Sequence, residues 1–202
     1  MRDPYLYDDV DVLRNLLDIK DDKQLETAES NITYIKLLDI DRLAENSDFD
    51  VEYLKHLHHY IFSDIYEWAG KFRTIPMLKG ERVLSGDTVR YSLPDDIEKD
   101  LIRAISDLKS VEWNTLSIDE TAKVYAEKIA ALWQVHPFRE GNTRTIITFS
   151  TQFAHANGFS MDKQLLKESA GYVRDALVKA SDGQYSEYQY LVKIFKEAIV
   201  NG

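Results

Sequence analysis

Helical periodicity is the feature that most constrains the fold of this chain. Apolar residues recur every three or four positions along most of its 202 residues, which places them on one face of a helix. The sequence Ser117-Ile-Asp-Glu120 is a capping box, and Pro94 suits a first helical position. We therefore expect a mainly α fold, with helices at residues 8–18, 21–44, about 50–68, 94–108, 117–133, 142–156, 162–179 and 185–199.

One segment departs from the helical pattern. Residues 72–93 are rich in Thr, Val, Ile and Tyr, and Lys79-Gly80 and Ser85-Gly86-Asp87 are turn signals. We expect one or two short strands here, forming a projecting β-hairpin. Its charged residues are mostly positive although the protein is acidic. The hairpin is therefore either a docking surface or an ordinary solvated hairpin, and the residues alone favour neither.

Composition excludes several classes of function. The chain has no cysteine, so it holds neither disulfides nor thiolate metal sites. Its formal net charge of −10 argues against nonspecific binding of nucleic acid. It has no signal-peptide core and no run of the roughly 18 apolar residues that a membrane helix needs. We expect a cytoplasmic protein with no nucleic-acid or membrane partner.

A short loop between two expected helices carries the residues suited to chemistry. Pro137 ends the first helix, and Gly141 allows a backbone turn just before the second. The free N–H groups at a helix start, together with the helix dipole, form an anion site that phosphate commonly occupies. The loop His136-Pro-Phe-Arg-Glu-Gly-Asn-Thr-Arg144 is therefore predicted to bind phosphate.

The side chains of this loop suit phosphoryl or nucleotidyl transfer. His136 titrates near neutrality and can accept a proton from a hydroxyl group. Glu140 is a hard oxygen ligand suited to Mg²⁺. Asn142 offers an amide donor, and Arg144 can hold phosphate oxygens with two parallel hydrogen bonds.

The pattern His136-x-Phe138-x-Glu140-Gly141-Asn142-x-Arg144 resembles the signature of the Fic family. The segments Arg2-Asp-Pro-Tyr-Leu-Tyr7, Asp64-Ile-Tyr-Glu-Trp-Ala-Gly70 and Phe72-Arg-Thr-Ile75 also resemble Fic segments. The resemblance implies one Fic-type helical bundle over residues 1–202, with a short β-hairpin flap beside the active-site loop. Within it we expect an N-terminal helical part at about 1–48, a Fic core at 49–180 and a C-terminal helix at 181–202.

The resemblance also implies an activity, namely transfer of AMP from ATP to a Ser, Thr or Tyr hydroxyl of another protein. His136 would activate the hydroxyl, and Glu140 would hold Mg²⁺ on the phosphates. The nucleotide-binding residues would be Gly141, Asn142, Thr143 and Arg144. The flap, at about 72–92, would dock the target protein by strand-like pairing.

Two positions depart from the family pattern. Thr143 stands where many Fic signatures have Gly, and Ile147 stands where they have a second Arg, which is tied to the terminal phosphate. Fic proteins are often inhibited by the glutamate of a Ser/Thr-x-x-x-Glu helix, and the only such spacing here is Ser63 to Glu67. We interpret that match as helix packing and expect control by a small antitoxin-like partner protein.

Several other side chains have two possible roles. The cluster His56 to His59 could bind a metal but is better explained by packing. Trp133 is expected in the core, and Arg139 is expected to face solvent. Three tyrosines are either packing residues or the lining of a base pocket: Tyr172, Tyr185 and Tyr188.

Two other functions remain open. One is a phosphotransferase with the nucleotide bound in reverse, as in the Doc relatives of Fic. The other is a catalytically weak protein that acts by binding a partner through its flap, which the Ile147 substitution favours.

Overall fold

Helices α4 (Ile118–Val135) and α5 (Asn142–Ala156) form the centre of the computed structural model, which describes residues 3–45 and 47–200. Helix α4 packs against α3, α5, α7 and α8, and α5 also packs against α2. The loop that carries the expected chemistry joins α4 to α5. It is therefore anchored at both ends by buried helices.

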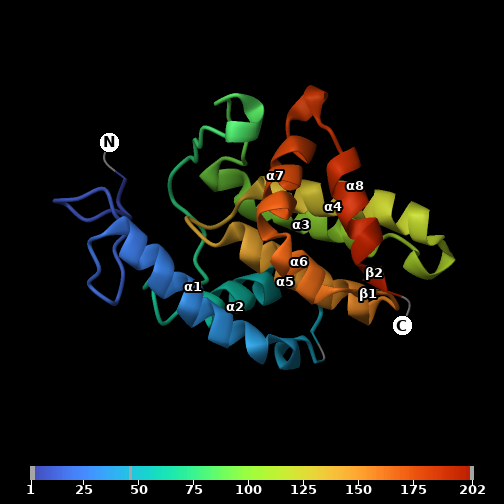
Figure 1. Cartoon of the computed structure of the whole chain (residues 1–202), viewed down its shortest axis with the longest axis horizontal. Coiled ribbons are helices and arrows are strands. Elements are labelled where there is room, and N and C mark those ends of the chain that lie inside the picture. The colour runs from blue at the N-terminus through green and yellow to red at the C-terminus, as the bar shows by residue number, and fades with distance from the viewer. Residues whose placement is uncertain (1–2, 46, 201–202) are drawn as a thin grey trace.

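Six further helices surround this pair in the described residues (Figure 1). They are α1 (Asp22–Leu38), α2 (Val51–Phe62), α3 (Ile97–Lys109), α6 (Lys163–Glu168), α7 (Ala170–Ala180) and α8 (Gln189–Ala198). A two-stranded antiparallel sheet pairs β1 (Ser160–Met161) with β2 (Ile199–Val200). This sheet lies outside the segment where the sequence predicts strands.

Local signals explain where the central helix begins and why it is buried. The Ser117 hydroxyl accepts from the Glu120 N–H, and the Glu120 carboxylate accepts from the Ser117 N–H, as the capping box predicts. Ala122, Ala126 and Ala130 of α4 are buried, and their small side chains allow neighbouring helices to approach closely. The mainly α class is confirmed.

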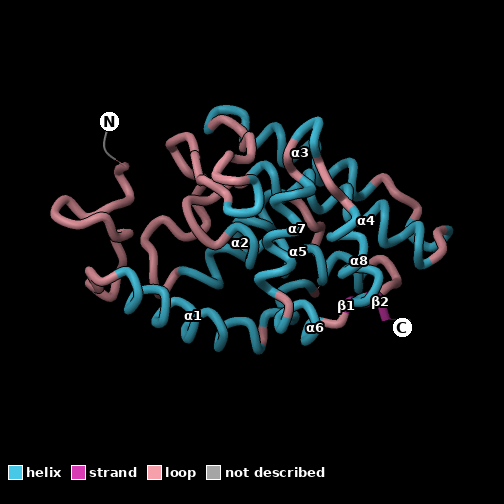
Figure 2. The backbone as a smooth tube through the Cα atoms, turned by 45° about the horizontal axis from the view of Figure 1, so that its top comes forward, coloured by secondary structure: helices cyan, strands magenta, loops and turns pink. Residues whose placement is uncertain are grey.

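Helix α1 lies along the outer edge of the molecule, as Figures 1 and 2 both show. It packs against α2, and its N-cap Asp21 accepts a hydrogen bond from the Gln24 N–H. Its inner face reaches the start of α5, because Glu29 forms an ion pair with Arg144, and Glu29 also accepts a hydrogen bond from the Tyr66 hydroxyl. The amino-terminal part of the chain thus contacts the residues after α2.

The expected helix at residues 8–18 is wrong. This stretch is a series of bends with one bridge, between Leu6 and Leu13. The Asn15 side chain accepts from the N–H groups of Leu17 and Ile19 and donates to the carbonyl of Leu13. A short amide side chain that binds nearby backbone groups competes with helix formation, and here it prevails.

Four other expected helices are shorter or divided. The stretch 21–44 is α1 followed by a 3₁₀ turn at Ile40–Ala44, and α2 ends at Phe62 rather than 68. The chain turns back there because the Gly70 N–H donates to the His58 ring. The stretch 162–179 is α6 and α7, divided at Ser169, and α8 begins only at Gln189.

The flap reverses direction as expected but forms no strand in the described residues. It contains a 3₁₀ turn at Arg82–Leu84, drawn in green at the top of Figure 1. Two backbone hydrogen bonds cross the base of the reversal, from Glu81 N–H to Asp87 C=O and from Gly86 N–H to Glu81 C=O. Across the next pair, the Lys79 N–H donates to the Thr88 hydroxyl instead of a carbonyl. A side chain replaces the backbone partner, so no ladder forms.

The described helices can be compared with membrane-spanning helices in length and apolar character. None has both the length and the apolar character that crossing a membrane requires.

Candidate active site

His136 lies at the C-terminal end of α4, where the backbone adopts the left-handed conformation with φ of 51°. The side chain is buried, and Tyr91 and Trp133 pack beside its ring, with centroids 4.1 and 5.2 Å away. Neither ring nitrogen has a hydrogen-bond partner in the described residues. A buried imidazole without a partner is available to a ligand group that reaches it.

Burial lowers the pKa of His136 well below its ordinary value of 6.5. The neighbouring cations Lys79, Arg73 and Arg174 lower this pKa further. The ring is therefore neutral at pH 7 and can accept a proton. Sequence reasoning predicted a base that titrates near neutrality, whereas the folded environment keeps the histidine deprotonated well below that range.

Asn142 closes the loop on itself. Its side-chain carbonyl accepts from the Phe138 N–H, and its amide nitrogen donates to the Phe138 carbonyl, at 2.8 and 2.7 Å. Both polar atoms of this buried side chain are thus used within the loop. One N–H of the side-chain amide is used in this way, and the Asn142 backbone N–H at the start of α5 is a further donor that suits phosphate.

Gly141 forms the sharp turn into α5. Its φ of +77° is unfavourable for any residue with a Cβ atom, and a Cβ placed here would lie 2.2 Å from the Phe62 ring. The first intrahelical bond of α5 runs from Thr145 N–H to Gly141 C=O. The N–H groups of residues 142–144 precede that bond and face the start of the helix, as an anion nest requires.

Glu140 stands at the entrance to this nest. Its Oε1 accepts from the Gly141 N–H at 3.0 Å, and its Oε2 lies 3.7 Å from the Lys79 ammonium. Burial would raise the pKa of this carboxyl, but Lys79, the Gly141 N–H and two arginines outweigh it and lower the pKa. Glu140 is therefore ionised at neutral pH, as a metal ligand must be.

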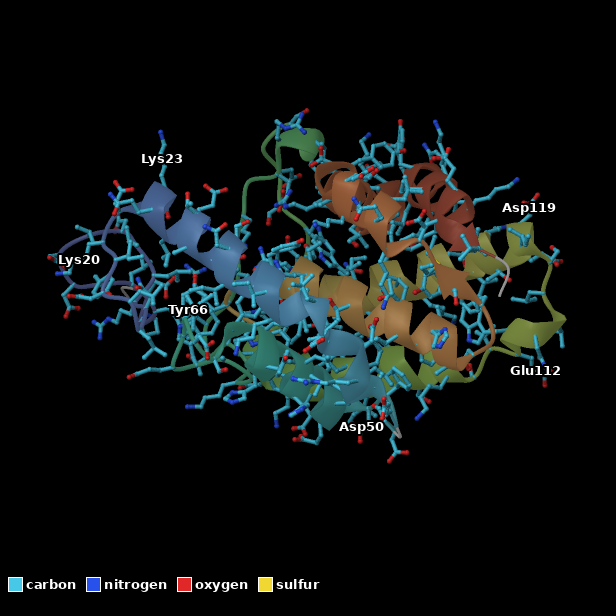
Figure 3. All side chains as sticks on the ribbon, turned by 60° about the horizontal axis from the view of Figure 1, so that its bottom comes forward. Lys20, Lys23, Asp50, Tyr66, Glu112 and Asp119 are labelled. Atoms are coloured by element: carbon cyan, nitrogen blue, oxygen red, sulfur yellow. The ribbon has the colours of Figure 1, made fainter. Side chains whose placement is uncertain are left out.

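Arg144 in the first turn of α5 is paired with a residue distant in sequence. Its Nη1 lies 3.2 Å from Glu29 of α1, and its guanidinium lies over the Phe62 ring. Glu29 also accepts from the hydroxyl of Tyr66, which Figure 3 shows beside α1. The pair orients Arg144, but it also neutralises one of the cations expected to hold phosphate.

Glu29 has no counterpart in the sequence reasoning, which singled out Glu67. Glu67 is exposed in the turn after α2, so the interpretation of Ser63 to Glu67 as helix packing is wrong. An in-chain carboxylate does meet the loop, but it comes from α1 and pairs with Arg144.

Of the three histidines on α2, only His58 is buried and contacts the loop, whereas His56 and His59 are exposed. The Gly70 N–H donates to Nδ1 of His58 at 2.8 Å, and His58 Nε2 lies 3.0 Å from the Glu140 carbonyl. Because Nδ1 accepts, the proton is on Nε2 and is donated to Glu140. The ring stacks on Phe138 at 3.8 Å. Packing is therefore the role of His58, whereas the exposed His59 has a polar role through its contact with the Ala69 carbonyl.

We expect His58 to make unfolding pH-dependent. Burial lowers its pKa to about 3, whereas the unfolded chain takes up the proton near 6.5. The stabilisation is complete above pH 6.5 and is lost as pH falls. His58→Gln lowers the free energy of unfolding, and this loss should be about 2 kcal/mol smaller at pH 5 than at pH 7. The difference follows from roughly 1.4 kcal/mol for each pH unit below 6.5. Urea denaturation measures it.

Leu57→Ala is the matched control for this measurement. Leu57 is buried on the same helix and carries no titrating group. We expect its cost in the free energy of unfolding to be the same at both pH values. An equal cost of His58→Gln at pH 7 and 5 would contradict a buried neutral His58.

Arg73 ties the loop to the flap, and sequence reasoning missed it. This buried guanidinium donates to the carbonyls of His136, Ile75 and Ser92. Its backbone N–H donates to the Pro137 carbonyl at 2.9 Å. One side chain thus satisfies carbonyls from both sides of the flap and from the catalytic loop. Only its place in a Fic-like segment distinguished it in the sequence.

The expectation that Arg139 faces solvent is wrong. Its guanidinium makes two hydrogen bonds to Asp3, at 2.7 and 3.0 Å, and both side chains are mostly covered. Nearby, the Tyr5 hydroxyl accepts from the Thr74 N–H. The amino-terminal segment therefore packs against the loop. Arg2, which belongs to the same sequence segment, lies outside the described residues.

A cavity of about 160 Å³ collects these groups. Its lining comprises Lys79, Trp133, His136, Glu140, Gly141, Asn142, Thr143, Arg144 and Arg174. All six site residues expected from the sequence are present. Trp133 is buried as expected and donates to the Thr143 hydroxyl. The sequence missed two cations, because Lys79 was assigned only to the flap and Arg174 has no distinguishing pattern.

Four other positions raised by the sequence do not line the cavity. Ile147 is partly buried against the core and does not line the cavity. The three C-terminal tyrosines, Tyr172, Tyr185 and Tyr188, are exposed and line no part of it.

The donor groups fit a magnesium ion bound together with phosphates. Among the described residues, no group of three or more His, Asp or Glu side chains could hold a metal by itself. Mg²⁺ in nucleotide sites is commonly held by one or two carboxylates and by the phosphates. Glu140, ionised and facing the cavity, is a carboxylate of the kind that could hold such an ion.

The fold and the cavity define a class of protein. It is a helical protein whose cavity, at a helix start, is suited to a phosphorylated ligand and contains a neutral histidine whose ring nitrogens have no partner in the described residues. The chain belongs to the Fic/DOC family, whose sequence pattern matches residues 48–154. The family resemblance of the loop is thereby confirmed over more than half of the chain.

Two similar proteins and a solved structure agree with this assignment. Protein adenylyltransferase VbhT of Bartonella schoenbuchensis is 36% identical over 79% of this chain, which covers 32% of that protein. The "Probable protein adenylyltransferase y4lH" of Sinorhizobium fredii is 30% identical over 91% of this chain and 90% of its own length. The chain thus spans about a third of VbhT and most of y4lH.

The solved structure is the N-terminal Fic domain of a cell filamentation protein of Bartonella quintana, a VirB-translocated Bep effector with bound ADP. It superposes with a TM-score of 0.80 at 25% identity, over 98% of this chain and 94% of that one. The mainly helical Fic fold is confirmed.

Proposed function

We propose that this protein is a protein adenylyltransferase, which transfers AMP from ATP to a hydroxyl group of a target protein. The observation that carries the proposal is the neutral, unpartnered His136 beside the start of α5. Two relatives are named as enzymes of this activity, and a related Fic domain holds ADP.

The cavity supplies the groups that the reaction needs. The target hydroxyl attacks the α-phosphorus, the bond to the bridging oxygen of the β-phosphate breaks, and pyrophosphate leaves. His136 accepts the hydroxyl proton, and the start of α5 stabilises the negative charge on the phosphates. Bound phosphates also offset the cations around His136, which raises the pKa of the ring toward the range of an effective base.

Mg²⁺ is part of the proposal, with Glu140 as its protein ligand. It would neutralise phosphate charge and favour departure of pyrophosphate. We place the reaction in the cytoplasm, where ATP is plentiful.

The flap is the proposed docking site for the target protein. Because residues 72–92 form no strand on their own, an extended target segment would supply the strand pairing. We also propose a small antitoxin-like protein as a partner. Its carboxylates would reach a cavity in which Lys79, Arg144 and Arg174 supply positive charge.

Labelled ATP tests the proposed reaction. The protein is incubated with a cell extract, Mg²⁺ and ATP labelled at either the α or the γ phosphate. We expect the α label on protein. Transfer of the γ label would instead identify a phosphotransferase of the Doc kind. If neither label reaches protein, the result counts against both transfer reactions and favours a protein that acts by binding a partner.

A further inference from the structure

Glu81 is the only buried Asp or Glu in the described part of the chain, although it lies in the flap. Its carboxylate is 2% exposed and accepts from Nη2 of Arg174 at 2.8 and 3.0 Å. The Tyr91 hydroxyl donates to the same carboxylate. A buried carboxylate is costly unless it is paired, so two donors fix it in one position.

Arg174 connects this pair to the nucleotide cavity. It projects from α7, whose side the 3₁₀ turn of the flap contacts (Figure 1). Only Nη2 is bound to Glu81, and Nη1 lies 3.8 Å from Asp175, beyond hydrogen-bond distance. The guanidinium is 42% exposed and lines the cavity together with residues 141–144 at the start of α5. It therefore keeps donors for a ligand.

The other two cations of the cavity are committed differently. Lys79 lies beside Glu140, and Arg144 is held by Glu29. Arg174, by contrast, is oriented by Glu81, a buried carboxylate that does not line the cavity. A guanidinium with one nitrogen fixed and the others open loses little freedom when it binds a phosphate oxygen.

We propose that Arg174 binds a phosphate oxygen of the nucleotide and that Glu81 is the positioning residue that orients it. The Tyr91 ring, which holds Glu81, also packs against His136. The flap, the phosphate-binding arginine and the base are therefore connected through one buried carboxylate. The inference rests on the proposed function for its ligand, but binding alone tests it.

Calorimetric titration with Mg²⁺ and AMPPNP tests this role in the full chain. We expect Arg174→Gln to weaken binding about tenfold or more, through loss of a charge-assisted hydrogen bond. Glu81→Gln should weaken it about three- to tenfold, because Arg174 is left unfixed. Since Glu81 acts through Arg174, the double variant should bind no more weakly than Arg174→Gln alone.

Arg82→Gln is the matched control. Arg82 is the next residue of the flap and pairs with Asp175 of α7, so the same two elements are joined, but its side chain is 81% exposed and does not line the cavity. We expect the nucleotide affinity of Arg82→Gln to equal that of the wild type. An equal loss in Arg82→Gln and Glu81→Gln would show that tethering the flap is sufficient and would overturn the positioning role.

Adenosine separates a phosphate contact from a base contact. If Arg174→Gln weakens adenosine and AMPPNP equally, Arg174 contacts the nucleoside and the proposal is wrong. Failure of the proposed function is distinguishable, because wild-type protein that binds AMPPNP yet transfers no label would refute transfer alone. If Glu81→Gln does not fold, Glu81→Asp, which keeps the charge but shortens the reach, should show the same loss of affinity with native helicity.

Discussion

Gly141→Ala should abolish nucleotide binding and destabilise the protein by roughly 2–5 kcal/mol. The new Cβ would lie 2.2 Å from the Phe62 ring, and it would occupy a left-handed backbone position. Left-handed geometry costs an alanine about 1–2 kcal/mol, and overpacking of a core costs about 1–3 kcal/mol. Relief of the clash would displace Gly141, and with it the start of α5. Urea denaturation and AMPPNP titration measure the two effects.

Gly158→Ala is the matched control, since Gly158 also has a positive φ, of +88°, but no atom within 4 Å of an added Cβ. Gly158→Ala should lose only the free energy that left-handed backbone geometry costs an alanine, and it should bind nucleotide with wild-type affinity. In a Phe62→Ala background, Gly141→Ala should cost less free energy of unfolding than it does in the wild type, because the ring that clashes is gone. Normal affinity in Gly141→Ala would refute the close packing of the loop on Phe62.

His136→Ala should reduce AMP transfer by about 10²–10⁴-fold, which is the usual contribution of a general base. The ring is buried, neutral and unpartnered, so its removal takes away the proton acceptor of the cavity. AMPPNP affinity should change little, because the phosphates contact the start of α5. Single-turnover transfer to the labelled target, with binding measured separately, gives both values.

A second variant separates the base from the backbone at this position. His136 has a positive φ, which Asn adopts more readily than Ala does. We therefore expect His136→Asn to fold like the wild type and to be as inactive as His136→Ala. Transfer at the wild-type rate by either variant would refute proton abstraction by His136.

The local parts of the fold could be predicted because their signals act over a few residues. The capping box at Ser117 joins residues only three positions apart, and the glycine before α5 turns the backbone at its own position. Helix α5 accordingly spans the predicted residues 142–156. The prediction of a helix at 8–18 failed for the same kind of reason. There the Asn15 amide binds backbone groups two and four residues away, which periodicity does not detect.

The candidate site was predictable in its residue types but not in its charge state. The loop 136–144 contains the base, the acid and the arginine within nine residues, and the cavity gathers them. Whether His136 is neutral at pH 7 depends on how deeply it is buried. Tyr91 supplies part of that burial, and its distance from His136 in the sequence conceals the contact.

The sequence by itself determined the helical class, the phosphate-binding loop and the chemistry of its side chains, because each depends on residues close together in the chain. Only the tertiary structure decided which distant residues hold the side chains of the site in place. Glu29 reaches Arg144, Arg73 reaches His136, and Glu81 reaches Arg174, each from a distant segment. Such pairs form only after packing brings the segments together and removes water, and no local pattern records that step.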